Sequence, residues 1–277
     1  SKLEMKESEL ITLSKEILII CEGASREVMD VYGADNDGLE IKEDGSPVTL
    51  ADISSHKVIL SGLSDLDPLF PVLSEEDIKK ESMDTNIFWL VDPLDGTKEF
   101  INKNGEFTVN IALIENGKPI LGVVSAPAIG ETFYGIPGFG SFKISHGKET
   151  RISTSNQDLS LCRITLSKSH QSQDDEDFIE ETKNHFKEVE IVPAGSSLKL
   201  CRVAENTADI YCRLGPTFQW DIAAGQAVAE GSGAVVKDLR GNSLSYEFNA
   251  EIRNPYFYCA ADPEYPWQAI LEVLNKV

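Results

Sequence analysis

Two aspartates stand three residues apart at the end of an apolar run, in the stretch WLVDPLDGTKEF from Trp89 to Phe100. Asp92 and Asp95 flank Pro93-Leu94, and because proline lacks a backbone N–H, we expect the strand to stop after Val91 and the chain to turn. In such a turn both carboxylates and the intervening carbonyl face the same space. Clustered oxygen ligands of this kind suit Mg²⁺. Taken alone, however, the D-x-x-D spacing is explained better by turn chemistry.

The residues after this pair are suited to an anionic ligand. Gly96 permits close approach of the backbone to a bound group. Thr97 begins a predicted helix, whose first amides and threonine hydroxyl are placed to hold a phosphate oxygen.

Two further acids are candidates for the same pocket. Glu75 follows the short predicted strand 70–73 in FPVLSEE, although alone it would be a solvent-facing loop residue. Asp221 precedes a predicted helix of small residues in FQWDIAAGQAVAEGSG. An ordinary N-cap aspartate is an equally good explanation of Asp221 in isolation.

These stretches resemble the lithium-sensitive, magnesium-dependent phosphomonoesterase superfamily of inositol monophosphatase. WLVDPLDGTKEF and WDIAAGQAVAEGSGA are similar to its two signature motifs, in the same order and at the expected separation, and the resemblance covers nearly the whole chain. It implies two or three Mg²⁺ ions, held by the carbonyl of Leu94 and by the carboxylates of Glu75, Asp92, Asp95 and Asp221. It also implies that Asp52 pairs with Thr97 to orient and deprotonate the attacking water, and that Glu75 takes part in catalysis.

Electrostatics agree with this ligand set. Four or five carboxylates in one pocket repel one another and acquire raised pKa values unless cations compensate. With two metal ions roughly 3.5–4 Å apart, such a cluster becomes a clamp for in-line phosphoryl displacement.

A second resemblance concerns the substrate. KEFINKNGEFTVNIALIENGKPILGVVSAPA and AGSSLKLCRVAENTADIYCRLGPTFQWD are similar to the bacterial 3′(2′),5′-bisphosphate nucleotidases of the CysQ group, which convert 3′-phosphoadenosine 5′-phosphate into AMP and phosphate during sulfate assimilation. The resemblance implies that Ser196, Lys199 and Arg213 face the nucleotide. It places His170 beside the adenosine or its 5′-phosphate. The resemblance also implies substrate contacts from Gly96 and Thr97, and from Glu75, Leu94, Asp95 and Asp221, which are shared with the metal site.

Two alternatives stay open at this point. An inositol monophosphatase or another sugar phosphatase would keep all metal ligands and differ around Lys199, Arg213 and His170. A surface lysine and a loop histidine would account for two of these residues. A non-catalytic phosphate-binding protein is disfavoured, because it would not need the water-activating pair Asp52 and Thr97.

The elements that must position these residues divide into two groups. The spacing of apolar residues predicts helices at 8–32 and 51–63, the second capped by Thr49, and Asp44-Gly45 has the composition of a hairpin turn. Strands are predicted at 70–73, 87–91, 107–115, 119–126 and 131–134, with an Asn116-Gly117 hairpin turn. After about residue 150, strands at 163–166, 188–192, 209–213, 234–236 and 256–259 alternate with helices at 175–185, 197–205, 220–230 and 263–275.

This order predicts a mixed α+β architecture. We expect an N-terminal α+β subdomain at 1–150, carrying most metal ligands, and a C-terminal α/β subdomain at 151–277, carrying Asp221 and the nucleotide contacts. The resemblance implies that both belong to the layered αβαβα sugar-phosphatase fold.

The amino-acid composition limits the classes of ligand and the cellular compartment that we expect for this protein. The 277 residues include 46 acidic and 25 basic side chains, giving a formal net charge of -21, which argues against nucleic acid as a partner but not against a small phosphate ester. The five cysteines form no C-x-x-C pair and are expected as buried free thiols in a reducing cytosol. With no signal-peptide pattern and no transmembrane run, we expect a cytoplasmic protein. Association with the cytoplasmic membrane face, the metal count and the oligomeric state stay open.

Overall fold

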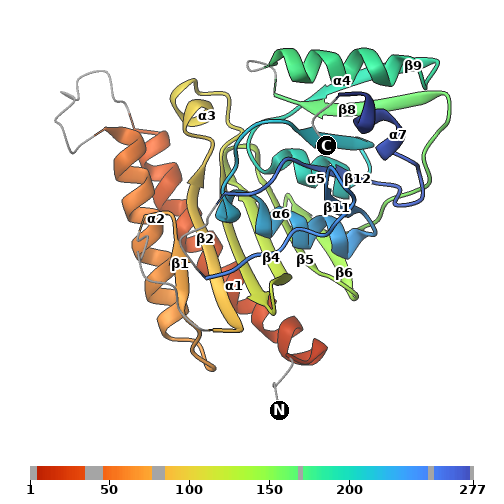
Figure 1. Ribbon diagram of the computed structural model, residues 1–277. Helices are drawn as coiled ribbons and strands as arrows, with labels where there is room; N and C mark the ends of the chain where they lie inside the picture. The colour runs from red at the N-terminus through yellow and green to blue at the C-terminus, as the bar shows by residue number, and fades with distance from the viewer. Residues whose placement is uncertain (1–4, 35–45, 77–84, 168–170, 249–252, 275–277) are drawn as a thin grey trace.

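Helices and sheets alternate in five layers through the computed structural model (Figure 1). It describes residues 5–34, 46–76, 85–167, 171–248 and 253–274. A pair of helices covers one face of a seven-stranded sheet, two helices fill the space between this sheet and a five-stranded sheet, and two helices cover the outer face of the second sheet. The αβαβα layering that the sequence implies is therefore confirmed.

The first layer consists of α1 (Glu7–Tyr32) and α2 (Pro47–Ser64), which pack against each other. Both helices were predicted, but Thr49 does not cap α2. Ser46 is the N-cap, and its hydroxyl accepts a hydrogen bond from the amide of Thr49 at 3.2 Å. The helix begins earlier than predicted because Pro47 occupies its first position, where the missing N–H costs nothing. The predicted Asp44-Gly45 turn lies outside the described residues.

The seven-stranded sheet follows the chain order. Its strands are β1 (Val72–Ser74), β2 (Ile87–Asp95), β3 (Thr108–Glu115), β4 (Lys118–Ala126), β5 (Glu131–Ile136), β6 (Gly140–Ser145) and β7 (Lys148–Ile152). β1 pairs with β2 in parallel, and the remaining pairs are antiparallel. Asn116 and Gly117 both have positive φ, as the hairpin turn requires. The sequence did not predict β6 and β7, whose residues are mostly partly or fully exposed.

The structure corrects the expected end of β2. The strand does not stop before Pro93 but continues to Asp95. Asp92 lies opposite Asn110 on β3 and Asp95 lies opposite Thr108, so three steps along β2 match two along β3. This β-bulge absorbs the proline, whose missing N–H need not join the ladder. After the bulge, α3 (Thr97–Ile101) begins at Thr97 as predicted, and a 3₁₀ turn, η1 (Pro127–Ile129), joins β4 to β5.

The five-stranded sheet has the order β11-β12-β10-β8-β9. These strands are β8 (Leu161–Leu166), β9 (Glu188–Pro193), β10 (Ile210–Arg213), β11 (Val235–Asp238) and β12 (Phe257–Ala260). The helices of this half are α4 (Gln173–Lys183), α5 (Leu198–Ala204), α6 (Gln219–Ser232) and α7 (Gln268–Leu271), and the last continues as η2 (Glu272–Leu274). The helix predicted at 263–275 is shorter than expected, because turns occupy the chain up to Pro266.

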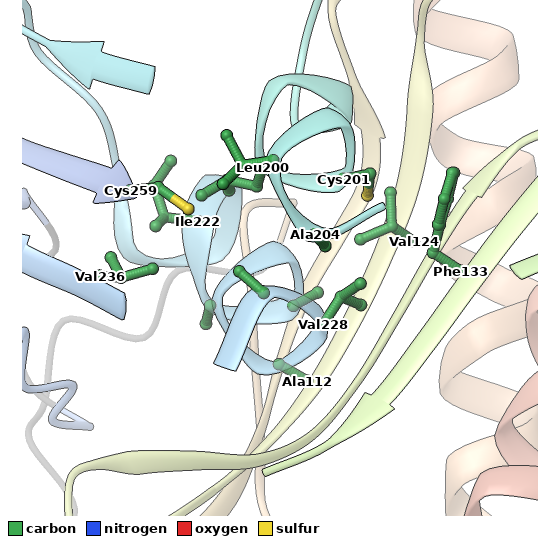
Figure 2. Close-up of a cluster of buried hydrophobic side chains, with 14 of the residues drawn as sticks. Ala112, Val124, Phe133, Leu200, Cys201, Ala204, Ile222, Val228, Val236 and Cys259 are labelled. Atoms are coloured by element: carbon green, nitrogen blue, oxygen red, sulfur yellow. The ribbon is translucent and has the colours of Figure 1, made fainter. Parts of the chain in front are cut away.

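Small residues let α6 lie unusually close to the first sheet. A Cβ atom at Gly122 of β4 would come within 2.4 Å of the carbonyl oxygen of Ala224 on α6, so only glycine fits there. Figure 2 shows the cluster around this helix, with Val124 and Phe133 on the side of the first sheet and Val236 and Cys259 on the side of the second. Tight packing on both sides fixes where α6 begins, and with it the position of Asp221.

The division into subdomains stays a proposal. The first sheet ends at Ile152 and the second begins at Leu161, which is compatible with a boundary near residue 150. One buried hydrophobic cluster nevertheless includes residues of both parts, among them Phe88 and Tyr211. All five cysteines are free and buried, as predicted.

Candidate active site

Three carboxylates from distant parts of the chain meet between the two sheets. Asp92 lies within β2, Asp95 is the last residue of β2 and Asp221 is the third residue of α6. Each offers an oxygen atom, and these atoms all lie within 4.8 Å of one another, a spacing that could hold a metal ion. Asp92 is 1% exposed, so its negative charge has almost no access to bulk water.

Asp221 is not the N-cap of its helix, the alternative that the sequence left open. Phe218 occupies the N-cap position, and its backbone N–H donates a hydrogen bond to Oδ2 of Asp221 at 2.9 Å. This bond satisfies one free amide of the first turn and fixes the carboxylate.

Glu75 and Asp52 belong to the same acidic region. The backbone N–H of Glu75 donates to the carbonyl of Val91 at 3.2 Å, which ties the end of β1 to β2. Burial raises the pKa of Glu75, a hydrogen bond with Asp92 opposes this, and the charge of Asp221 raises it further. Asp52 lies on α2, and the pKa of its carboxyl is raised to about 8 by burial, by a hydrogen bond with Glu76 and by the charges of Glu76 and Glu75.

Burial and mutual repulsion dominate the electrostatics of this cluster. Burial raises the pKa of Asp92 well above its usual value, and the neighbouring charges of Asp95, Asp221 and Glu75 raise it further. Burial and the charge of Asp221 also raise the pKa of Asp95, against the opposing effects of Lys199 and the Ser197 amide. Oδ2 of Asp92 and Oδ1 of Asp52 are buried without a hydrogen-bond partner. Unpaired, converging carboxylate oxygens are the donor set of a hard divalent cation, so these residues fit a metal site.

Gly96 and Thr97 form the turn that leads out of β2. Gly96 has a φ of 85°, and a Cβ atom there would come within 2.0 Å of the hydroxyl oxygen of Ser196. Glycine is therefore required by both its backbone conformation and the close approach of the α5 segment. Thr97 is exposed at the start of α3. The pairing of Thr97 with Asp52 stays a prediction, as does the role of the Leu94 carbonyl.

A cavity of about 730 Å³ adjoins the carboxylates and extends toward the second sheet. Its lining includes residues from both ends of the proposed site, among them Asp95, Thr97, Ser196, Lys199, Arg213 and Asp221. Lys199 is 7% exposed, and its ammonium group lies 5.4 Å from the centre of the Tyr211 ring. Burial and the charge of Arg213 lower the pKa of Lys199, whereas Asp95 and two glutamates oppose the shift.

Arg213 offers a second cation to this cavity. One of its terminal nitrogens donates to the carbonyl of Pro216 at 3.2 Å, while its Nε atom is buried without a partner. A buried guanidinium N–H that lacks an acceptor is costly unless a ligand supplies one. Asp95 and Asp221 of the acidic cluster thus line the same cavity as the cations Lys199 and Arg213. His170 lies outside the described residues.

Ser197 contacts one of the expected metal ligands, and sequence reasoning missed this residue. Its backbone N–H donates to Oδ2 of Asp95 at 2.9 Å. Ser196 has a positive φ of 55°, and its hydroxyl donates to the carbonyl of Glu106 at 2.6 Å. The AGSSLK segment signals the start of a helix, but nothing in its composition shows which amide faces the acids.

Among the residues that the structure describes, no helix has the length and apolar character needed to cross a membrane.

Comparison with known proteins gives one consistent result. A sequence model of the inositol monophosphatase family matches residues 11–271. A Salmonella typhimurium protein named 3′(2′),5′-bisphosphate nucleotidase CysQ is 43% identical over 246 residues, which are 88% of this chain and 97% of that protein. A protein of the same name from Buchnera aphidicola is 36% identical, over 89% of this chain and 92% of its own length.

Solved structures agree with the fold. The crystal structure of CysQ from Bacteroides thetaiotaomicron, a bacterial member of the inositol monophosphatase family, superimposes with a TM-score of 0.81 at 34% identity, covering 91% of this chain and 98% of that one. An inositol monophosphatase from Zymomonas mobilis has a TM-score of 0.76 at 20% identity, covering 98% of this chain and 100% of that one. The second likeness concerns the fold alone.

Proposed function

The chain belongs to the inositol monophosphatase family, and we propose that it is a Mg²⁺-dependent phosphomonoesterase that removes the 3′-phosphate of 3′-phosphoadenosine 5′-phosphate, leaving AMP and phosphate. One observation carries the proposal: Asp95 and Asp221, two of the three convergent carboxylates, line the same cavity as the cationic side chains of Lys199 and Arg213. The acids suit a metal-assisted reaction at one phosphate, and the cations suit recognition of a second phosphate.

Asp92, Asp95 and Asp221 would hold the metal, together with Glu75 and the carbonyl of Leu94. When bound, the metal ions supply Lewis-acid charge that stabilises the phosphate oxygens and makes a water molecule more acidic. We propose two or three ions. Their positive charge also removes the mutual repulsion that raises the pKa values of these carboxyls in the free chain.

Asp52 and Thr97 would orient the attacking water, and Asp52 would accept its proton. A carboxyl whose pKa is about 8 in the free chain is a stronger base than an ordinary aspartate. The amides at the start of α3, after Gly96, would hold oxygens of the phosphate that leaves. The close packing of the turn around Gly96 against Ser196 would keep these amides at a fixed position relative to Asp95.

At the other end of the cavity, Lys199 and Arg213 would bind the 5′-phosphate, and Ser196 would contact the nucleotide nearby. A substrate with one phosphate would leave the buried Nε atom of Arg213 without an acceptor. Because a buried donor without a partner is costly, this arrangement favours a bisphosphate over an inositol monophosphate. The role of His170, inhibition by lithium and the place of the reaction in sulfate assimilation stay predictions.

The identity of the product tests this proposal directly. Incubation of 3′-phosphoadenosine 5′-phosphate with the protein and Mg²⁺, followed by chromatography, is expected to give 5′-AMP. Release of 3′-AMP instead would show that the phosphate ends are assigned the wrong way round. The Asp95→Asn variant is the control, since it should bind the nucleotide but lose turnover. A wild-type protein that binds the nucleotide without any product would be a binding protein and not an enzyme.

A further inference from the structure

Three buried polar side chains close a ring of hydrogen bonds behind the acidic cluster. The hydroxyl of Ser197 donates to Oδ1 of Asn110 at 2.7 Å, and Nδ2 of Asn110 donates to Oγ1 of Thr108 at 2.9 Å. Oγ1 of Thr108 lies 2.8 Å from Oγ of Ser197. Because Ser197 has one hydroxyl proton and gives it to Asn110, Thr108 must donate in this last bond. The ring is therefore closed and runs in one direction.

The ring joins the two halves of the candidate site. Thr108 and Asn110 are on β3, where they lie opposite Asp95 and Asp92 of β2. Ser197 stands 87 residues further along the chain than Asn110, at the N-terminal end of α5. All three side chains are nearly inaccessible, with exposures of 0%, 0% and 2%. Residues directly opposite each other in an antiparallel pair project from the same face, so the ring and the two aspartates share one side of the sheet.

The hydroxyl of Ser197 takes part in the ring and does not cap the helix that follows it. Ser197 is the N-cap of α5, a position where a serine hydroxyl normally accepts a bond from an amide of the first turn, yet its side chain makes no such cap. Its backbone N–H donates instead to Oδ2 of Asp95 at 2.9 Å. The preceding residue, Ser196, adopts a positive φ of 55°, which is unfavourable for a residue other than glycine. The missing side-chain cap and the positive φ of Ser196 are both unfavourable, and both accompany a backbone that faces β2 and β3.

The same turn also carries Lys199, in the first turn of α5. We infer that Thr108 and Asn110 are positioning residues, which lock the turn at 196–199 onto β3 and so hold Asp95 in its metal-binding orientation and Lys199 at a fixed distance from it. Neither residue lines the cavity, and neither needs to touch substrate or metal. Stability alone does not explain the ring, because three apolar side chains of the same shape would fill the space with a similar or more favourable free energy of folding.

This inference rests on the proposed metal-dependent phosphatase function, and Mg²⁺ binding without substrate can test it separately. Thr108→Val removes the ring hydroxyl with little change in shape, and Thr108→Ser keeps the hydroxyl. Ser141→Ala is the control for lost stability, because the buried hydroxyl of Ser141 also bonds the first sheet to a helix of the middle layer, donating to the carbonyl of Val228 at 2.6 Å. Ser141 is on β6 and outside the lining of the cavity.

The measurement is the Mg²⁺ concentration that gives half of the maximal rise in melting temperature, with isothermal calorimetry as a second readout. We expect Thr108→Val to need about tenfold more Mg²⁺, as for the loss of one buried hydrogen bond, and to raise KM for the nucleotide more than it lowers kcat. Thr108→Ser should stay within about twofold of wild type, and Ser141→Ala should lower the melting temperature without changing the Mg²⁺ requirement.

If Thr108→Val fails to fold, Ser197→Ala serves in its place. This variant also removes a hydroxyl of the ring, and we expect it to change the Mg²⁺ requirement in the same way. An unchanged Mg²⁺ requirement in the folded ring variants would overturn the inference, and so would an equal change in Ser141→Ala. A wild-type protein that binds Mg²⁺ but does not hydrolyse the nucleotide would refute the proposed function alone, because the Mg²⁺ titrations would still test the ring. A wild type that does not bind Mg²⁺ would refute both.

Discussion

The hydroxyl group of Ser55 donates a hydrogen bond to the carbonyl oxygen of Pro93 at 2.7 Å, and both groups are buried. Pro93 lies in the β-bulge between Asp92 and Asp95, so this bond attaches the bulge to α2. Asp52 stands three residues before Ser55 on the same helix and therefore on the same face. One contact thus fixes the distance between the proposed base and the proposed metal ligands.

Ser55→Ala should consequently impair catalysis as well as stability. It leaves a buried carbonyl without a partner, which costs ~1–3 kcal/mol, and frees the bulge to move. We expect a melting temperature several degrees lower and a reduced kcat at saturating Mg²⁺, measured by thermal unfolding and phosphate release. Ser64→Ala is the matched control on α2, since the exposed hydroxyl of Ser64 bonds only locally, to Ser61. Equal kcat values for the two variants would contradict the role given to Ser55.

Gly96 and Gly138 separate the effect of backbone conformation from that of close packing. Their φ angles are nearly equal, 85° and 84°, but a Cβ atom at Gly138 would meet no atom within 4 Å. Alanine at either position should cost ~1–2 kcal/mol of backbone strain, and in thermal unfolding Gly96→Ala should melt lower still, because its Cβ also collides with Ser196. We expect only Gly96→Ala to lose activity, by about tenfold or more, because its Cβ displaces Ser196 and with it Asp95. Comparable kcat/KM losses in both variants would be evidence against this.

Lys199 and Arg213 are expected to distinguish substrates by their number of phosphates. The Lys199→Ala and Arg213→Ala variants should lose activity on 3′-phosphoadenosine 5′-phosphate by about a hundredfold, as for a charged hydrogen bond, while activity on a monophosphate ester changes little. The comparison of kcat/KM on both esters measures this. Lys187→Ala, at an exposed position, removes the same charge elsewhere. Equal losses on both substrates would argue against a second phosphate at these residues.

Glu230 provides a pH-dependent test of the core, remote from the proposed site. Burial raises the pKa of this carboxyl, against a hydrogen bond from Gln226 at 2.7 Å and the charge of Lys118. Because the folded pKa lies above the unfolded value near 4.3, its contribution to stability is complete below that pH and is lost as pH rises through the folded pKa.

Glu230→Gln removes the buried charge and can keep the bond from Gln226. The variant should therefore melt about 2–4 °C above wild type at pH 8, if the charge costs ~1 kcal/mol, and close to wild type at pH 4. Thermal unfolding at both pH values in the presence of Mg²⁺ decides the matter. A variant that melts below wild type at pH 8 would indicate that the charge of Glu230 is stabilising.

Local sequence signals predicted the elements well where one physical effect dominated. The apolar spacing in α1 and the Asn116-Gly117 turn each have a single good explanation, and both were predicted correctly. Thr49 was predicted as the helix cap, but Ser46 can cap as well, and Pro47 at the first helical position favours Ser46. β7 was missed because its sequence, KETRI, is mostly polar and exposed, and so has no buried face to reveal.

In the candidate site too, residues close together in the sequence could be predicted, whereas contacts between distant residues could not. Asp92 and Asp95 are near in sequence, so their convergence could be predicted locally, although a β-bulge within β2 brings them together and not the expected turn after Val91. The neighbours that complete the site come from far away in the chain. Glu76 meets Asp52 across 24 residues, and Thr108 meets Ser197 across 89. Such contacts depend on how β3, α2 and α5 pack, which no local pattern encodes.

The measurement that tests the central claim most directly is phosphate release by the wild-type protein from 3′-phosphoadenosine 5′-phosphate and from inositol 1-phosphate, across a titration of Mg²⁺. We expect release that requires Mg²⁺ and a kcat/KM for the nucleotide at least about a hundredfold higher, as for one charged contact to the second phosphate. Equal or greater efficiency on inositol 1-phosphate would contradict the assignment of Lys199 and Arg213, and release that persists in EDTA would contradict the metal site itself.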